Sequence, residues 1–202
     1  MINLGAVETA LDTLNARAPE LFSRSLLIGG WCALIYYQSL VDSRDPDHPA
    51  PVPESRERLI SKDIDFTNVW SEDFFDALPD FVVHPDKGAP YLKIGEIRLG
   101  FAQVPEAIDP EEAFEKSRKL RTRAGTIYSL LDPVRLYRGK LAMIQKGRGK
   151  ANDTFHLQIA STYARFELAE AIRMAASNPE AGVQVDVLTQ EIRDLAPELL
   201  RD

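Results

Sequence analysis

The sequence predicts an α/β (α+β) fold, in which a mixed β-sheet flanked by helices is followed by a C-terminal helical segment. Three observations predict this class. Short apolar runs typical of strands alternate with helical patterns through the first part of the chain. Helical patterns alone fill the last part. The chain has 202 residues, 45% of them hydrophobic, which is enough for a core in one domain with a helical extension.

The N-terminal segment predicts a helix, a buried strand and a second helix. Apolar residues recur at helical spacing over residues 2–19, namely Leu4, Val7, Ala10, Leu11 and Leu14. The apolar run at 25–28 stops at two glycines, which predicts a strand and a tight turn, and helical spacing resumes over 31–41. Residues 43–58 are rich in proline and charge, and therefore predict a loop, either a lid over a site or an exposed disordered segment.

The middle of the chain predicts strands and helices in alternation. Residues 109–123 predict a helix whose acidic residues come first and whose basic residues come last, which suits the helix dipole. The other predicted elements here are strands over 59–70, 81–85, 91–104 and 124–131 and a helix over 71–81. This order places the sheet-forming domain at residues 1–131.

The C-terminal segment, residues 132–202, predicts helices alone. They cover 132–146, which opens with Asp132 and Pro133, then 152–177 and 186–202. Glycine or proline separates each helix from the next. The last helix is amphipathic, and either packs on the core or forms a homodimer contact.

Composition excludes several classes of function. The net charge of −7 does not draw the protein to nucleic acid or to an anionic membrane through its overall field. A single cysteine, Cys32, excludes an intramolecular disulfide and a zinc site built from cysteines. A buried thiol is favoured over a nucleophile because no histidine lies near Cys32 in the sequence. No apolar run approaches a membrane span, and the amphipathic opening segment does not resemble a signal peptide, so we expect a cytoplasmic protein.

Two aspartates stand inside a predicted buried strand, in the stretch RLISKDIDFTNVW (58–70). Strand side chains alternate, so Asp63 and Asp65 share one face while Ile64 and Phe66 share the other. Carboxylates on one face of a strand are typical ligands for Mg²⁺, which takes one or two of them together with substrate phosphates. Aspartates of a solvated edge strand are the alternative interpretation.

The glycine pair Gly29-Gly30 lies between a predicted strand and a predicted helix. Without Cβ atoms, the backbone there can approach an anion, and the helix N-terminus behind it adds positive potential. A purely structural tight turn is the alternative. The order strand, glycine pair, helix and then a strand with Asp63 and Asp65 favours a phosphate and metal site over either feature alone.

Three stretches of the chain resemble the nucleotidyltransferase superfamily, and within it the small bacterial AbiEii-type toxins. They are LLIGGWCALIYY, SKDIDF and GKLAMIQKGRGKANDTFHL, which together span about residues 24 to 160. The resemblance implies that Asp63 and Asp65 bind Mg²⁺ (or Mn²⁺) and the triphosphate of an NTP. It implies the remaining nucleotide-binding roles for Gly29, Gly30, Ser61, Lys62, Lys140 and Asp153. Arg148 is a further candidate for nucleotide phosphate, because it lies near Lys140 and Asp153 in the sequence.

The resemblance implies transfer of an NMP from the NTP to a hydroxyl acceptor, as part of a toxin–antitoxin or phage-defence system. Such enzymes place a third carboxylate on a neighbouring strand, where it activates the acceptor hydroxyl as a base. The candidate here is Glu96, in the strand predicted over 91–104. Arg98 shares its face and competes for the position, and His156 stands where the family often has an acid.

Two basic clusters stand out against the acidic background, at residues 116–123 (KSRKLRTR) and 146–150 (KGRGK). Both suit a phosphate backbone, and both equally suit solvent. Because the toxins that the chain resembles include enzymes that modify tRNA ends, the resemblance implies RNA, such as a tRNA end, or a protein as the acceptor. It also implies a cognate antitoxin protein as a further partner. His156 contacts phosphate or packs between helices.

Three readings follow for the whole protein. The first is an Mg²⁺-dependent nucleotidyltransferase. The second is a degenerate nucleotidyltransferase fold that binds nucleotide or a partner protein without chemistry. The third is an interaction domain in which the aspartates form salt bridges with Lys62 or Arg98. The position of Glu96 relative to Asp63 and Asp65 separates the first reading from the second.

Overall fold

The chain forms two compact units in the computed structural model, which describes residues 4–59, 61, 63–68, 82–83, 90–94, 97–102, 108–178 and 182–201. The first unit comprises Met1–Cys32 and Ser55–Asp132, and the second comprises Ala33–Glu54 and Pro133–Asp202. The division falls one residue after the predicted boundary at 131/132, and it differs from the prediction in a second respect. Residues 33–54 group with the C-terminal helices, because the helix after the glycine pair continues into the second unit.

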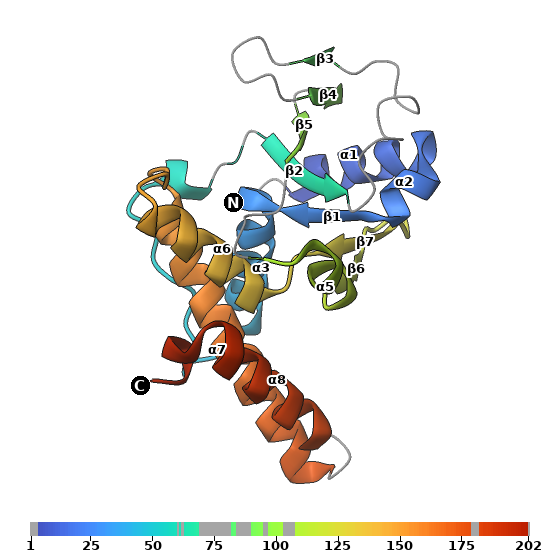
Figure 1. Ribbon diagram of the computed structural model, residues 1–202. Helices are drawn as coiled ribbons and strands as arrows, with labels where there is room; N and C mark the ends of the chain where they lie inside the picture. The colour runs from blue at the N-terminus through green and yellow to red at the C-terminus, as the bar shows by residue number, and fades with distance from the viewer. Residues whose placement is uncertain are drawn as a thin grey trace. The chain divides into compact units, whose positions relative to one another are not determined.

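The first unit is built on a mixed sheet with the strand order β3-β4-β5-β2-β1-β7-β6 (Figure 1). Its described strands are β1 (Ser25–Ile28), β2 (Asp63–Asn68), β3 (Val82–Val83), β4 (Pro90–Ile94), β5 (Ile97–Phe101), β6 (Arg118–Arg121) and β7 (Ile127–Leu130). The pairs β1–β7 and β2–β5 are parallel, and the other neighbouring pairs are antiparallel. This arrangement, with helices beside the sheet, confirms the predicted fold class.

Apolar faces hold this unit together. The helix α1 (Leu4–Arg17) buries Val7, Ala10, Leu11 and Leu14, the same positions whose spacing predicts it. The short helix α2 (Pro19–Ser23) carries Phe22, whose ring meets the ring of Phe66 on β2 edge-on at 6.3 Å. The 3-10 turn η1 (Arg56–Leu59) precedes β2. Because α2 packs on the face of β2 that carries Phe66, the two aspartates of β2 belong to the opposite face.

The strand predicted over 91–104 is wrong as a single element. The structure divides it into β4, which ends at Ile94, and β5, which begins at Ile97, and the two pair antiparallel with Ile94 opposite Ile97. A continuous apolar and polar alternation does not distinguish one long strand from a tight hairpin, because the period of two is the same in both. The helix predicted over 71–81 lies outside the described residues.

The helix predicted over 109–123 is also too long. The helix α5 (Pro110–Glu115) begins at the cap Asp109, whose side chain accepts from the backbone N–H of Glu112, and it ends before the basic cluster. Residues 118–121 instead form β6, paired antiparallel with β7. Charge order along the segment suits a helix dipole, yet pairing with a neighbouring strand outweighs that local preference.

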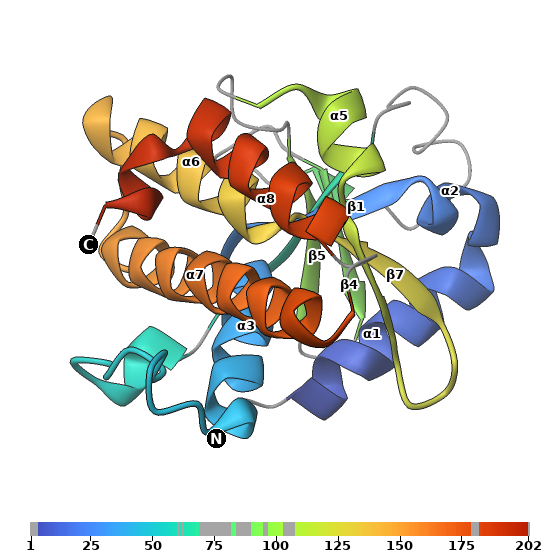
Figure 2. The ribbon, with the colours of Figure 1, turned by 90° about the horizontal axis from the view of Figure 1, so that it is seen from below.

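The second unit is helical and contains the rest of α3 (Gly29–Ser43) with α6 (Pro133–Gln145), α7 (Asp153–Ser177), α8 (Gly182–Leu195) and the 3-10 turn η3 (Pro197–Leu200). Figure 2 shows α6, α7 and α8 side by side. Tyr36 of α3 packs its ring 4.3 Å from the ring of Tyr163 on α7. The buried guanidinium of Arg135 on α6 pairs with Glu191 on α8. The helices predicted over 132–146 and 152–177 are confirmed. The helix predicted over 186–202 is wrong in its bounds, because α8 begins at Gly182 and ends at Leu195 and Pro197 then opens the 3-10 turn η3.

Residues 44–54 of the proline-rich loop predicted over 43–58 belong to the second unit, where they are attached to α7. The Asp45 carboxylate accepts a hydrogen bond from Arg173 at 2.8 Å, and the ring of His48 meets that of Phe166 at 6.1 Å. Arg173 also pairs with Glu170 one turn away. The hydrogen bond from Arg173 and the backbone N–H of Asp47 lower the pKa of Asp45 to about 2.

Releasing this attachment is expected to loosen the loop. Because the pKa of Asp45 is depressed, its ion pair stabilises the folded state above the ordinary pKa of 3.8. That contribution is lost as the pH falls from 3.8 to about 2. Arg173→Gln removes the ion pair at neutral pH, and we expect faster amide hydrogen exchange over residues 44–54. Equal exchange in the wild type, in Arg173→Gln and in the control Arg138→Gln would show that the pair contributes nothing.

Two other predictions concern single features. The Cys32 side chain is buried and donates to the backbone carbonyl of Leu131 at 3.3 Å, as expected of a structural thiol. Among the described residues, no helix is long and apolar enough to cross a membrane.

Candidate functional site

The side-chain alternation predicted for β2 is present in the structure. Ile64 is 0% exposed and Phe66 is 1% exposed, so both lie in the core. Asp63 and Asp65 point to the other face and are partly exposed. Their Cα atoms are separated by two strand rises, roughly 6.5–7 Å. The strand therefore presents two carboxylates together without burying either of them completely.

The Asp65 carboxylate lies between two glycines that have space for it only because they lack side chains. A Cβ on Gly29 would come within 2.6 Å of Asp65 Oδ2, and a Cβ on Gly100 would come within 2.9 Å of Oδ1. Gly29 also has a φ of +76°, a conformation that favours glycine. Strand pairing creates this arrangement, because Asp65 stands opposite Ile28 on one side and Gly100 on the other.

Gly29 is at the same time the first residue of α3, with Gly30 following in the first turn. The N-terminus of a helix favours negative charge, since its first backbone N–H groups lack partners within the helix. The structure thus brings the glycine pair and Asp65 together, as the motif order in the sequence predicts.

Asp63 has a buried and unsatisfied oxygen. Its Oδ1 has no hydrogen-bond partner among the described residues, and the Nε atom of Arg98 lies 3.9 Å away from it. That separation is too long for a hydrogen bond. An unsatisfied carboxylate oxygen is costly unless a cation or donor reaches it, which makes this position suitable for a metal ligand.

The other residues predicted around the pair differ in how far the structure describes them. Ser61 Oγ donates to the backbone carbonyl of Asp63 at 3.1 Å, so it holds the start of β2. Lys62 and Glu96 lie outside the described residues, and the role of Glu96 as third carboxylate stays a prediction. Within the part of the chain that the structure describes, no group of three or more His, Cys, Asp or Glu side chains is placed to hold a metal.

Lys140 and Asp153 form a buried ion pair inside the second unit. Lys140 is 9% exposed and Asp153 is 2% exposed, and the ammonium lies 2.5 Å from Asp153 Oδ1. Asp153 Oδ2 accepts from the backbone N–H of Lys150 at 2.6 Å, and His156 Nδ1 lies 3.8 Å from Oδ1. Burial by itself raises the pKa of Asp153, but the nearby His156 ring and the hydrogen bonds from Lys140 and Lys150 outweigh it and hold that pKa below its usual range.

This network joins the C-terminal part of α6 to the first turn of α7, which gives both residues a structural role. Their predicted contact with nucleotide stays a prediction. His156 is buried against the same carboxylate, which agrees with helix packing. Arg148 lies in the exposed loop between the two helices, after Gly147 with its φ of +67°.

Sequence reasoning missed Gly100, Tyr91 and Lys93, which lie on the same sheet face as the carboxylates by strand pairing. One signal for Gly100 was available, because a glycine inside a strand often marks a close approach by another group. Tyr91 and Lys93 gave no signal, since their position depends on the hairpin of β4 and β5.

Two carboxylates on one strand face fit a divalent cation such as Mg²⁺. The ion prefers oxygen ligands and is commonly bound by one or two carboxylates that leave further positions for water and phosphates. The unsatisfied oxygen of Asp63 and the space around the Asp65 carboxylate match that requirement. Asp63 and Asp65 are therefore the residues that would hold the metal.

No protein-family model matches the chain, and no curated protein matches it. Among solved structures, the chain is similar to the crystal structure of an antigenic nucleotidyltransferase-like protein from Paracoccidioides brasiliensis. The two chains share 12% identity with a TM-score of 0.47, and the alignment covers 89% of this chain and 92% of the other. A likeness of this degree does not assign the chain to a family.

Proposed function

We propose that this protein is an Mg²⁺-dependent nucleotidyltransferase that moves an NMP from an NTP to a hydroxyl acceptor. One observation carries the proposal. Asp65 lies between Gly29 and Gly100 at the start of α3, and Asp63 stands on the same strand face with an Oδ1 atom that has no hydrogen-bond partner among the described residues. A carboxylate pair beside a glycine turn and a helix N-terminus suits a metal-bound triphosphate.

The residues of this chain have distinct roles in the proposed reaction. Asp63 and Asp65 hold the metal, and the backbone of Gly29 and Gly30 approaches the phosphates. When bound, Mg²⁺ (or Mn²⁺) offsets the charge that develops on the phosphates. The acceptor oxygen forms a bond to the α-phosphorus, the bond to pyrophosphate breaks, and the hydroxyl proton passes to a base, for which Glu96 is the candidate.

The finer parts of the proposal rest on the sequence resemblance. They are the choice of RNA, such as a tRNA end, or protein as acceptor, and the role as a toxin with a cognate antitoxin. A homodimer is proposed from the amphipathic last helix, and a cytoplasmic location from the pattern of the opening segment. Lys62, Lys140 and Asp153 keep their proposed roles at the nucleotide on the basis of the resemblance, and Arg148 keeps its proposed role because it lies near Lys140 and Asp153 in the sequence.

A second candidate function is favoured by Arg98. It stands directly opposite Asp63 in the parallel pair of β2 and β5, with Nε 3.9 Å from Asp63 Oδ1. A cation at that position suits binding of phosphate and does not suit proton abstraction from an acceptor. The corresponding function is binding of a nucleotide, or of a partner protein, without chemistry.

Removal of either carboxylate is expected to abolish transfer. Asp63→Asn and Asp65→Asn keep the side-chain shape and remove the charge that would hold the metal. We expect each to lower the rate of NMP transfer from labelled NTP by roughly 100-fold or more, about 2.7 kcal/mol of transition-state stabilisation. The assay supplies Mg²⁺ with total RNA or with the protein itself as acceptor, and Mn²⁺ binding is measured separately by calorimetry.

Asp186→Asn is the matched control, because Asp186 is an exposed carboxylate on α8. Equal labelling by the wild type and both site variants would refute the catalytic proposal. Binding of Mn²⁺ and NTP that depends on Asp63 and Asp65, with no transfer to any acceptor, would establish the second candidate instead.

A further inference from the structure

The sheet face that carries Asp63 and Asp65 continues outward over β5 and β4. Strand pairing aligns Asp63 with Arg98 and Arg98 with Lys93, and it aligns Asp65 with Gly100 and Gly100 with Tyr91. Residues directly opposite in neighbouring strands share a face. The other face of the same strands is in the core, since Leu92 is 1% exposed and Leu99 is 0% exposed.

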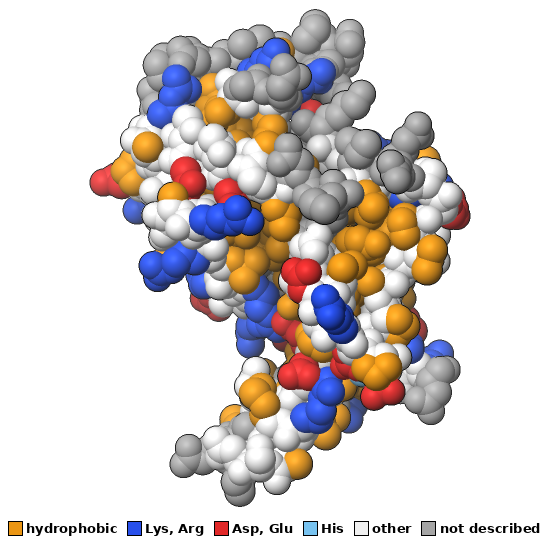
Figure 3. All heavy atoms as spheres, turned by 180° about the vertical axis from the view of Figure 1, so that it is seen from behind, with side chains coloured by type: hydrophobic (Ala, Val, Ile, Leu, Met, Phe, Trp, Pro, Cys, Tyr) orange, Lys and Arg blue, Asp and Glu red, His pale blue; other side chains and the backbone are white. Residues whose placement is uncertain are grey.

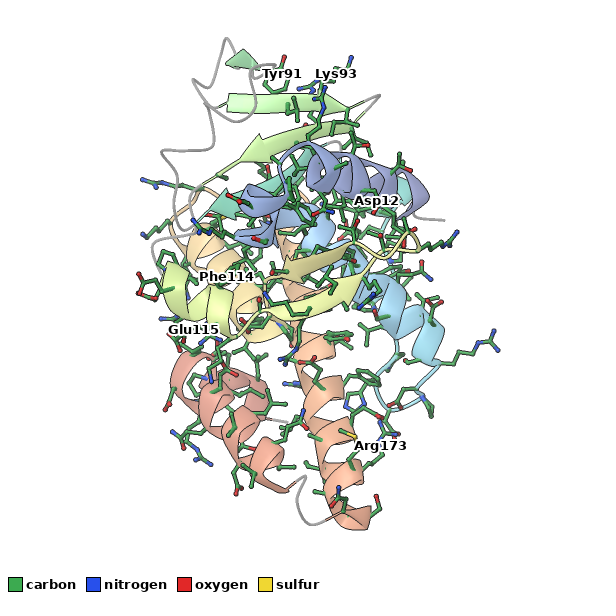
Figure 4. The ribbon with its side chains drawn as sticks, turned by 90° about the vertical axis from the view of Figure 1, so that its right-hand side faces the viewer. Asp12, Tyr91, Lys93, Phe114, Glu115 and Arg173 are labelled. Carbon is green, nitrogen blue, oxygen red and sulfur yellow. The ribbon has the colours of Figure 1, made fainter. Side chains whose placement is uncertain are left out.

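Three side chains, Tyr91, Lys93 and Arg98, form what we name the cationic surface. Lys93 and Arg98 are exposed and Tyr91 is partly exposed. The Arg98 guanidinium lies 6.0 Å from the centre of the Tyr91 ring, within the range of a cation–π contact. Figure 4 labels Tyr91 and Lys93 on β4, at the outer part of the sheet.

The cationic surface contains an unfavourable pair. Lys93 and Arg98 stand directly opposite each other, and like charges in that position destabilise a sheet. Arg98 has Asp63 as an acidic neighbour at 3.9 Å, whereas Lys93 forms no ion pair with an acid among the described residues. An anionic ligand on this face would relieve the repulsion, which is the physical reason to look for one.

The glycine turn and the cationic surface lie on opposite sides of the carboxylates. Gly29 follows β1, which pairs with β2 on one side, while β5 and then β4 extend from the other side. If the nucleotide phosphates occupy the glycine turn, the cationic surface lies on the flank that remains for the acceptor. This step rests on the proposed function.

We infer that Tyr91, Lys93 and Arg98 bind a single-stranded nucleic-acid segment beside Asp63 and Asp65, which makes the acceptor a nucleic acid. Lys93 and Arg98 contact its phosphates, and the Tyr91 ring stacks on a base. Phosphate contacts combined with an aromatic ring are the usual means of holding a single strand without reading its sequence.

The overall charge of the protein does not attract nucleic acid, so binding depends on the residues of the cationic surface. The protein carries a net charge of −7, and Figure 3 shows acidic and basic side chains interspersed on the face that it draws. A general attraction to polyanions is therefore weak, and binding depends on the few residues that are correctly placed. Neutralising one of them is expected to have a measurable effect.

The experiment measures binding of a fluorescent single-stranded 12-mer, as RNA and as DNA, by anisotropy over a range of salt without NTP or Mg²⁺. We expect Lys93→Gln and Arg98→Gln each to weaken binding several-fold and to reduce the slope of log K against log salt by about 0.7, one phosphate contact on a single strand. Tyr91→Leu is expected to weaken binding by roughly 5- to 100-fold with an unchanged slope. Arg138→Gln, which neutralises an exposed cation on α6, is the control.

Circular dichroism and thermal melting confirm that each variant is folded. No binding by the wild type, or equal affinity and slope in the wild type and all three variants, would overturn the inference. Because the binding assay contains no NTP, its result does not depend on whether the protein transfers an NMP. Binding without transfer would retain the cationic surface and refute the enzyme, and transfer only to protein would retain the enzyme and refute a nucleic-acid acceptor.

Discussion

Gly29→Ala is expected to destabilise the fold by about 2–4 kcal/mol and to eliminate metal binding. Two costs combine at this position. The new Cβ would lie 2.6 Å from Asp65 Oδ2, and the φ of +76° costs an L-residue about 1–2 kcal/mol. Relief of the clash requires the carboxylate to move away from its position beside Asp63. Chemical denaturation measures the first effect, and Mn²⁺ titration measures the second.

Two other glycines separate the two costs. Gly125 has a φ of +101° and open space where a Cβ would lie, so Gly125→Ala is expected to show the backbone cost alone. Gly100→Ala brings a Cβ within 2.9 Å of Asp65 Oδ1 at an ordinary φ, and is expected to show the clash alone.

The double variant Gly29→Ala/Asp65→Ala removes the clash and is expected to recover part of the lost stability. If Gly29→Ala lowers the free energy of unfolding by no more than Gly125→Ala does, the close approach of the Asp65 carboxylate to position 29 is wrong.

Lys140→Met is expected to destabilise the protein by about 3–5 kcal/mol at neutral pH. The substitution leaves the Asp153 carboxylate buried without its ammonium partner, and an uncompensated buried charge has a cost of this size. Urea unfolding measures the change. Arg138→Met, on the exposed side of the same helix, is the control and is expected to change stability by less than about 0.5 kcal/mol.

The pH dependence of this effect identifies its origin. The depressed pKa of Asp153 stabilises the folded state above the unfolded value of 3.8, and that contribution is lost as the pH falls below it. The difference between the wild type and Lys140→Met is therefore expected to shrink below about pH 4. If Lys140→Met is as stable as the wild type and loses only its affinity for nucleotide, that result would instead support the proposed role of Lys140 at the nucleotide.

Local sequence determined much of the carboxylate site. The alternation of Asp63 and Asp65 with Ile64 and Phe66 follows from the period of a strand, since only one phase buries the apolar pair. The glycine pair predicted a turn, and the structure places Gly29 there with a positive φ. The long helices were readable because many residues contribute to a period of 3.6.

The secondary structure predicted from the sequence is wrong where a helix and a strand compete for the same segment. Residues 116–123 carry the charge order of a helix end, and a short helix alone is marginal in water. Pairing with β7 satisfies the backbone of 118–121 instead, with Leu120 opposite Tyr128. The information that decided this segment lies in another strand and is absent from the segment itself.

The sequence by itself determined the fold class, the shared face of Asp63 and Asp65 and the glycine turn, because each depends on local periodicity or on the freedom of glycine. The tertiary structure alone decided that Gly100 makes space for Asp65, that Arg98 stands opposite Asp63 and that Lys140 pairs with Asp153. These facts depend on strand register and helix packing, which join residues distant in sequence. Position along a chain does not specify which distant residues meet.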